Sequence, residues 1–108
     1  MPHLVILDTP NLDTDTDMTA LCRNLADAML VVRDEAGAQV FPTDGTGVLA
    51  YPAAHSAVAD DSGDHAFCYF NLRMRHGRSA ATQEAAGQAL VAVAKAHFAR
   101  CWRGVRWG

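Results

Sequence analysis

The chain has 108 residues, of which 50% are hydrophobic and 19% charged, and its formal net charge is -3 at pH 7. This is the composition of one globular domain that is long enough to bury a core. No apolar run approaches the ~18 residues of a membrane span, and no basic segment precedes an apolar one as in a secretory signal. Three cysteines without Cys-x-x-Cys spacing indicate reduced thiols. We therefore expect a cytoplasmic protein without a membrane partner.

Charge is distributed unevenly along the chain. Nearly every acidic residue precedes His65, and most arginines follow it. A basic half can indicate nucleic-acid binding, but these arginines are not interleaved with aromatic residues on one face. The close spacing of Arg73, Arg75 and Arg78 instead favours a small anionic substrate, and no nucleic-acid partner is expected.

The first predicted element is a short buried strand over His3–Leu7, directly after Met1-Pro2. Removal of Met1 would leave Pro2 with a free secondary amine. Burial disfavours the charged ammonium and would lower the pKa of that amine, and a neutral amine can act as a general base. The alternative is that Met-Pro has no chemical role, as in many proteins.

An acidic run, Asp13–Asp17, resembles the start of a calcium-binding loop. That reading fails because Met18 stands where the loop requires glycine and Asn24 where it requires glutamate. The five histidines also lack metal-ligand spacing. No metal site is expected.

The acidic run suits the start of a helix, with Thr14 or Thr16 as its N-cap. Apolar residues then recur at helical spacing: Met18, Leu21, Leu25, Met29 and Val32. Gly37 is a typical stop. The sequence therefore predicts an amphipathic helix from about Thr16 to Ala36.

The second half repeats this order. A short strand over Val48–Tyr51 ends at Pro52, and a loop leads to a longer strand over Ala66–Met74. Ser79 then caps a helix from about Ala80 to Ala99. The fold class is α/β (α+β), with two βαβ units around one sheet and both helices on one face. The second unit lacks its closing C-terminal strand.

Several separated motifs in this order resemble the 5-carboxymethyl-2-hydroxymuconate isomerase family of the tautomerase superfamily. They are Met1-Pro2-His3, Phe41-Pro42, Asp64-His65-Ala66-Phe67, Gly77-Arg78-Ser79 and Lys95-Ala96-His97-Phe98. The resemblance covers residues 1–99, which we treat as a tautomerase-like domain. It implies a fold similar to that of macrophage migration inhibitory factor, a homotrimer with active sites at subunit boundaries, and no metal or organic cofactor.

The same resemblance implies an activity and two site residues. The family moves a double bond in an unsaturated 2-hydroxy or 2-oxo diacid during breakdown of aromatic acids. Carried over by motif, Pro2 is the catalytic base and acid, and Arg78 binds a carboxylate of this dicarboxylate substrate or stabilises the dienolate. Guanidinium suits that role because it is permanently charged and can bind bidentately. A solvated turn arginine is the alternative for Arg78.

One position departs from the family pattern. Gly47 stands where a second arginine is expected shortly after the Phe41-Pro42 turn. Either that arginine is dispensable, or Arg73 or Arg75 replaces it, or catalysis is impaired. The last case gives the alternative function, a tautomerase-fold binding or interaction protein. An unrelated small ligand-binding module, with Pro2 incidental, is a third possibility.

Residues 100–108 form an atypical C-terminal tail that neither alternates nor fits a helix. Written in GC-rich codons and read two bases later, this run encodes Leu-Leu-Ala-Arg-Arg-Pro-Leu-Gly, an ordinary helix end. We therefore hypothesise a shift of reading frame near Arg100, with a genuine divergent tail as the alternative. A sheet without its last strand has an unpaired edge, so a weakened or aggregation-prone trimer with exposed Trp102 and Trp107 is expected.

Overall fold

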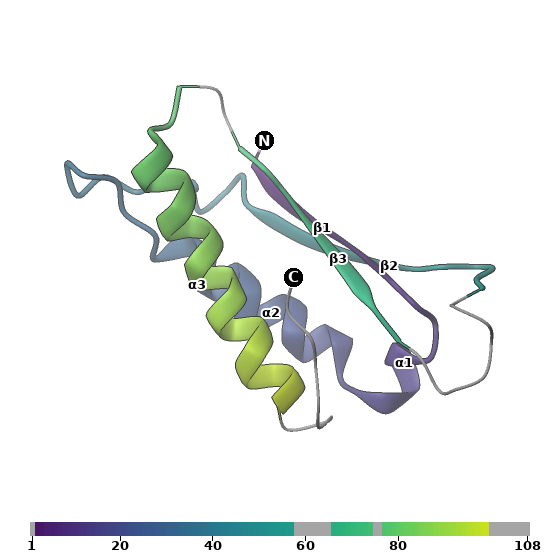
Figure 1. The fold of residues 1–108 in the computed structure, drawn as a ribbon. Coiled ribbons are helices and arrows are strands. Elements are labelled where there is room, and N and C mark those ends of the chain that lie inside the picture. The colour runs from purple at the N-terminus through teal and green to yellow at the C-terminus, as the bar shows by residue number, and fades with distance from the viewer. Residues whose placement is uncertain (1, 58–65, 75–76, 100–108) are drawn as a thin grey trace.

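The computed structural model describes residues 2–57, 66–74 and 77–99. Its centre is a mixed sheet with the order β2-β1-β3, formed by β1 (His3–Asp8), β2 (Gly47–Pro52) and β3 (Cys68–Arg73). Strand β1 pairs in parallel with β2 and antiparallel with β3 (Figure 1). The N-terminal segment is thus the middle strand, and its position is fixed by neighbours on both sides.

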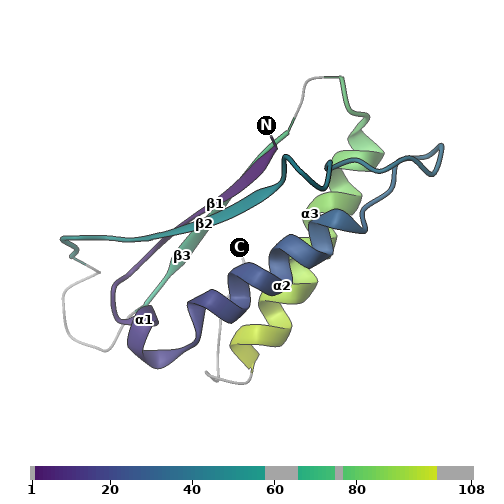
Figure 2. The same ribbon diagram turned by 180° about the vertical axis from the view of Figure 1, so that it is seen from behind.

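Helices cover one face of this sheet (Figures 1 and 2). A short helix α1 (Leu12–Asp15) leads into α2 (Met18–Leu30), and α3 (Ala80–Ala99) packs beside α2. The core lies between these helices and the sheet. Its fully enclosed large side chains come from β1, both early helices and the loop before β2: Leu4, Ile6, Leu12, Leu21, Leu25, Met29 and Phe41.

The predicted fold class is confirmed by this arrangement. Parallel strands β1 and β2 with α2 between them form the first βαβ unit, and β3 with α3 repeats its first two elements. The predicted cap of α3 is also present, since Ser79 Oγ accepts a hydrogen bond from the Thr82 amide at 3.1 Å. The proposed tail and part of the predicted loop, residues 58–65, lie outside the described residues.

The predicted boundaries of the first long helix were wrong at both ends. Asp17, rather than either threonine, caps α2, because its Oδ1 accepts from the Ala20 amide at 2.9 Å. The helix ends at Leu30 instead of Ala36. Beyond it, Asp34 accepts hydrogen bonds from the amides of Ala36 and Ala38 and holds a turn instead of a further helical turn.

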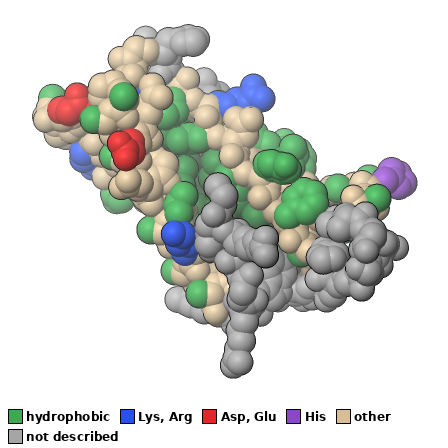
Figure 3. Space-filling model, viewed as in Figure 1, with side chains coloured by type: hydrophobic (Ala, Val, Ile, Leu, Met, Phe, Trp, Pro, Cys, Tyr) green, Lys and Arg blue, Asp and Glu red, His purple; other side chains and the backbone are tan. Residues whose placement is uncertain are grey.

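The sheet face opposite the helices carries exposed apolar side chains at one end. Leu7 is the register partner of both Tyr51 and Tyr69, so these three side chains form one row across the strands. They are 53%, 51% and 67% exposed, respectively. Figure 3 shows hydrophobic side chains gathered over the strands. Within the described ranges, no helix is long and apolar enough to cross a membrane.

Candidate active site

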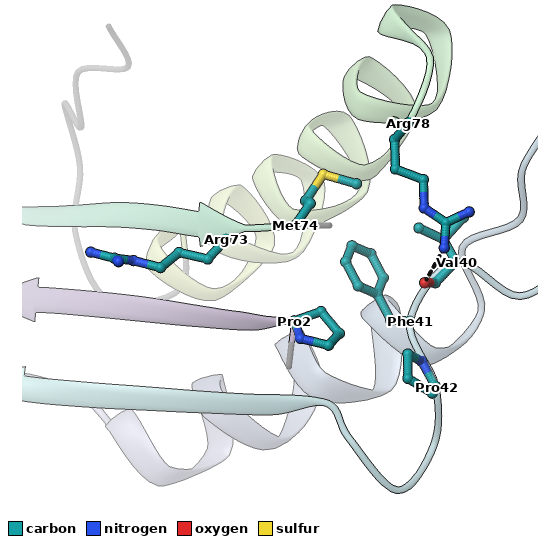
Figure 4. Close-up of a pocket in the computed structure, with 7 residues that line it drawn as sticks. All are labelled: Pro2, Val40, Phe41, Pro42, Arg73, Met74 and Arg78. Atoms are coloured by element: carbon teal, nitrogen blue, oxygen red, sulfur yellow. Dashed lines mark hydrogen bonds between the residues drawn. The ribbon is translucent and has the colours of Figure 1, made fainter. Parts of the chain in front are cut away.

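A cavity of about 410 Å³ lies at the end of the sheet where β1 begins. Segments far apart in the sequence form its wall (Figure 4). They are the start of β1, the loop before β2, the end of β3 and the turn that precedes α3, which contribute Pro2, Val40, Phe41, Pro42, Arg73, Met74 and Arg78. The two residues predicted to carry the chemistry, Pro2 and Arg78, therefore lie in one cavity.

Pro2 is placed by the strand that follows it. His3 pairs with Gly47 of β2 and with Arg73 of β3, so the chain is held on both sides immediately after the proline. The Pro2 ring is half-buried and borders the cavity (Figure 4). A central strand thus presents the N-terminal segment to the cavity in a fixed direction.

Arg78 is held by the loop that follows α2. Its Nη2 donates to the Val40 carbonyl at 3.2 Å, and its Nη1 lies 3.9 Å from Asp34 Oδ2. The backbone of Arg78 is held as well, since Gln83 Nε2 donates to its carbonyl at 3.0 Å. The Arg78 side chain is 27% exposed, which leaves part of the guanidinium open to an anion.

Phe41 and Pro42 form the wall between these two residues. The sequence indicated only a turn at this point, but the Phe41 ring is 1% exposed and lies between Pro2 and Arg78 (Figure 4). Met74 adds its thioether to the same side of the cavity. An apolar wall beside a cation suits a ligand with a hydrocarbon middle and a charged end.

Gly47 and Arg73 occupy one row of the sheet, because both are register partners of His3. Apart from its chain neighbours, no atom of the described residues lies within 4 Å of a Cβ placed on Gly47, so there is space for a side chain to begin there. Arg73 lines the cavity, but its guanidinium points away from Pro2 and Arg78 (Figure 4). Arg75, the other predicted substitute for an arginine at position 47, lies outside the described residues.

The opposite end of β1 carries a polar group that sequence reasoning missed. Asp8 is 3% exposed, and neither of its carboxylate oxygens has a hydrogen-bond partner among the residues that the structure describes. Burial, followed by the charge of Asp13, raises the pKa of Asp8. The signal was present in the alternation of β1, since Leu4, Ile6 and Asp8 fall on the same face and that face is the core.

Two thiols lie near this carboxylate. Cys68 is the register partner of Asp8. Burial, with a smaller contribution from the Asp8 charge, raises the pKa of Cys68 to about 11, and the same two causes raise the pKa of Cys22. These cysteines are therefore protonated at neutral pH and weakly nucleophilic. No group of three or more His, Cys, Asp or Glu side chains that could hold a metal ion occurs in the described part of the chain.

Comparison with known proteins places this geometry among enzymes of one kind. A family model for 5-carboxymethyl-2-hydroxymuconate isomerase matches residues 2–106. The crystal structure of a 5-carboxymethyl-2-hydroxymuconate delta-isomerase is similar to this chain with a TM-score of 0.87 and 57% identity, over 93% of this chain and 72% of that one. The crystal structure of a 5-carboxymethyl-2-hydroxymuconate isomerase from Deinococcus radiodurans R1 is also similar, with a TM-score of 0.76 and 33% identity. The match covers 92% of this chain and 70% of that one. None of the curated proteins matches the chain.

Proposed function

The chain belongs to the 5-carboxymethyl-2-hydroxymuconate isomerase family, and from this premise we propose how it works as an isomerase. The substrate is an unsaturated 2-hydroxy or 2-oxo diacid like 5-carboxymethyl-2-hydroxymuconate, and the reaction moves a double bond. The activity serves the breakdown of aromatic acids in the cytoplasm. Pro2 is the catalytic base and acid, and Arg78 binds a substrate carboxylate.

The observation that carries this proposal is the position of Pro2 and Arg78 on one cavity with an apolar wall between them. Once Met1 is removed, the neutral amine of Pro2 accepts a proton from the dienol hydroxyl group. Electrons move through the conjugated carbons, and the resulting ammonium returns a proton to a carbon further along the chain. Atoms balance, because one proton leaves oxygen, one proton arrives at carbon and the double bonds shift between them.

Arg78 supports this transfer by charge and by geometry. Its guanidinium is permanently positive, and the Val40 carbonyl fixes its direction at the cavity. A carboxylate held there places the apolar middle of the substrate against Phe41, with the reacting carbons toward Pro2. Positive charge at this position also stabilises negative charge that develops on the dienolate.

The exposed apolar row of Tyr51, Leu7 and Tyr69 supports a homotrimer. A face of this kind is rare on monomeric proteins and marks an interaction surface. We propose that other copies of the chain cover it and complete the cavity at the subunit boundary. Sedimentation velocity tests this proposal: a trimer is expected, whereas a monomer at micromolar concentration would contradict it.

The activity is tested by following ketonisation of a 2-hydroxymuconate dienol in D₂O. We expect loss of the conjugated absorbance together with deuterium at the carbon that receives the proton. A processed protein that binds the dienol but leaves its rate of ketonisation unchanged would favour the alternative, a catalytically impaired binding protein. The support for that alternative is Gly47, the β2 partner of His3, which stands where the family pattern has a second arginine.

A further inference from the structure

The turn after α2 directs a carboxylate at Arg78. Asp34 Oδ1 accepts hydrogen bonds from the amides of Ala36 and Ala38, both at 2.9 Å. Its other oxygen, Oδ2, lies 3.9 Å from Arg78 Nη1. One oxygen of Asp34 is thus engaged by its own turn, and the second faces the arginine.

The neighbouring acid prevents this turn from moving away. Glu35 accepts a hydrogen bond from the Ser79 hydroxyl at 2.6 Å and another from the Thr82 hydroxyl. These bonds lower the pKa of Glu35, so it is charged at neutral pH. Asp34 and Glu35 therefore contact Arg78 and Ser79, respectively. The contact of Glu35 with Ser79 holds Asp34 near the guanidinium.

The Val40 carbonyl and the Asp34 carboxylate act on the Arg78 guanidinium in different ways, because they lie at different distances from it. The Val40 carbonyl, at 3.2 Å from Nη2, is within range of a directional hydrogen bond. Asp34 Oδ2, at 3.9 Å from Nη1, is beyond that range and interacts through charge alone. Loss of the Asp34 charge would therefore leave the orientation of Arg78 to Val40 while raising the positive potential at the cavity.

We propose that Asp34 is a built-in counter-charge that weakens the binding of an anionic ligand to Arg78. A ligand carboxylate and Asp34 are both attracted to one guanidinium and repel each other. The ligand consequently binds less tightly than it would to an unopposed arginine, which keeps release of an anionic product fast. This inference rests on the proposed role of Arg78 and adds a second residue to it.

Asp34→Asn tests the charge separately from the turn. The amide oxygen of asparagine can still accept from the Ala36 and Ala38 amides, so the turn is retained while the charge is lost. The probe is trans,trans-muconate, an unsaturated dicarboxylate without a hydroxyl or keto group, titrated by calorimetry or NMR. We expect its Kd to fall about two- to fivefold, as for a partly exposed ion pair. The gain should shrink at high ionic strength.

Two comparisons make this result specific. Asp27→Asn changes the net charge equally, but Asp27 lies on α2 and pairs with Arg23 at 2.8 Å, so its Kd for muconate should match that of the wild type. In an Arg78→Ala background, Asp34→Asn should lower the Kd by less than it does beside Arg78, because only the direct repulsion between Asp34 and the ligand carboxylate is then removed. If Asp34→Asn does not fold, Asp34→Ser removes the charge while keeping an acceptor for the turn.

Unchanged or weaker muconate binding by Asp34→Asn would contradict the proposed role of Asp34. An equal gain in affinity in the Arg78→Ala background would contradict it as well. So would the absence of muconate binding by both the wild type and Asp34→Asn. The proposed isomerase activity fails on a different result, the absence of ketonisation by processed wild-type protein. Binding of muconate requires no turnover, so the two failures are distinguishable.

Discussion

The two ends of strand β1 differ in almost every physical respect. At one end, Pro2 borders an open cavity of about 410 Å³ that also holds a partly exposed arginine. At the other end, Asp8 is 3% exposed, and within the described part of the chain neither of its carboxylate oxygens has a hydrogen-bond partner. The first end has accessible groups that a ligand can reach, and the second has a group that neither ligand nor solvent reaches.

The contrast shows why a titratable group is not by itself a site. Asp8 has a raised pKa, which is common at catalytic positions, but it is 3% exposed and does not line the cavity that holds Pro2 and Arg78. Pro2 and Arg78 are accessible and lie on one cavity with an apolar wall. Changes at the Pro2 end should therefore affect catalysis, and changes at the Asp8 end should affect stability.

The largest effect is expected from Pro2→Ala at the open end. A processed variant has a primary amine of different basicity and geometry, so kcat should fall about 10²–10⁴-fold, as for loss of a general base. Steady-state ketonisation kinetics, with N-terminal processing verified by mass, provide the measurement. Unchanged turnover in the processed variant would remove Pro2 from the mechanism.

The next effect is that of Arg78→Ala, which removes the cation from the same cavity. Loss of a charge-assisted hydrogen bond costs about 1.5–3 kcal/mol, so kcat/KM should fall roughly ten- to a hundredfold, mainly through KM. Arg78→Lys keeps the charge and should lose less. Equal losses for the two variants would mean that Arg78 acts through structure instead of binding a carboxylate.

At the closed end, Asp8→Asn should stabilise the protein at neutral pH by roughly 1–3 kcal/mol, because it removes a buried charge without a partner. The folded-state pKa of Asp8 lies above its ordinary value of 3.8, so the folded protein holds the proton more tightly than the unfolded chain. The stability of the wild type should therefore rise as pH falls from that raised pKa toward 3.8.

Urea unfolding of both proteins, at equal concentrations at pH 7 and pH 4, measures this difference. The advantage of Asp8→Asn should be larger at pH 7 than at pH 4, because the raised pKa of Asp8 lets the folded wild type take up a proton before the unfolded chain does as the pH falls. Asp27→Asn, at an exposed acid of α2, controls for net charge. A destabilised Asp8→Asn, or an advantage independent of pH, would show that Asp8 is not an unpartnered charge.

The smallest effect is expected from Gly47→Arg. A Cβ fits at this position, because it would have no atom within 4 Å among the described residues other than the chain neighbours of Gly47. The new side chain would lie on the row of His3 and Arg73, and activity toward a dicarboxylate should rise about two- to fivefold, the scale of a partly exposed ion pair. A matched Gly47→Gln variant controls for bulk. No change or a fall in activity would argue against this position as a second carboxylate clamp.

Much of the fold followed from local patterns. A short apolar run predicted β1, helical spacing predicted α2 and α3, and Ser79 was correctly identified as a cap. The end of α2 was missed because Val32 continues the apolar spacing into a segment that is not helical. There, the side chain of Asp34 competes for backbone amides, an effect that periodicity does not register.

The candidate site was only partly predictable. Motifs named Pro2 and Arg78, but no local pattern indicated that Asp34 and the Val40 carbonyl contact the same guanidinium. These contacts join the loop after α2 to the turn before α3, segments that are distant in the sequence. The positions of Gly47 and Arg73 on either side of His3 could not be predicted either, because they depend on the register of the strands.

The central claim is that the amine of Pro2 moves the proton. The most direct measurement compares ketonisation by two preparations of the same chain, one with Met1 removed and one with Met1 retained, each verified by intact mass. A retained Met1 converts the Pro2 nitrogen into an amide without basicity. We expect at least a ~100-fold lower kcat for that preparation, with folding and assembly unchanged. Equal rates for the two preparations would contradict the claim.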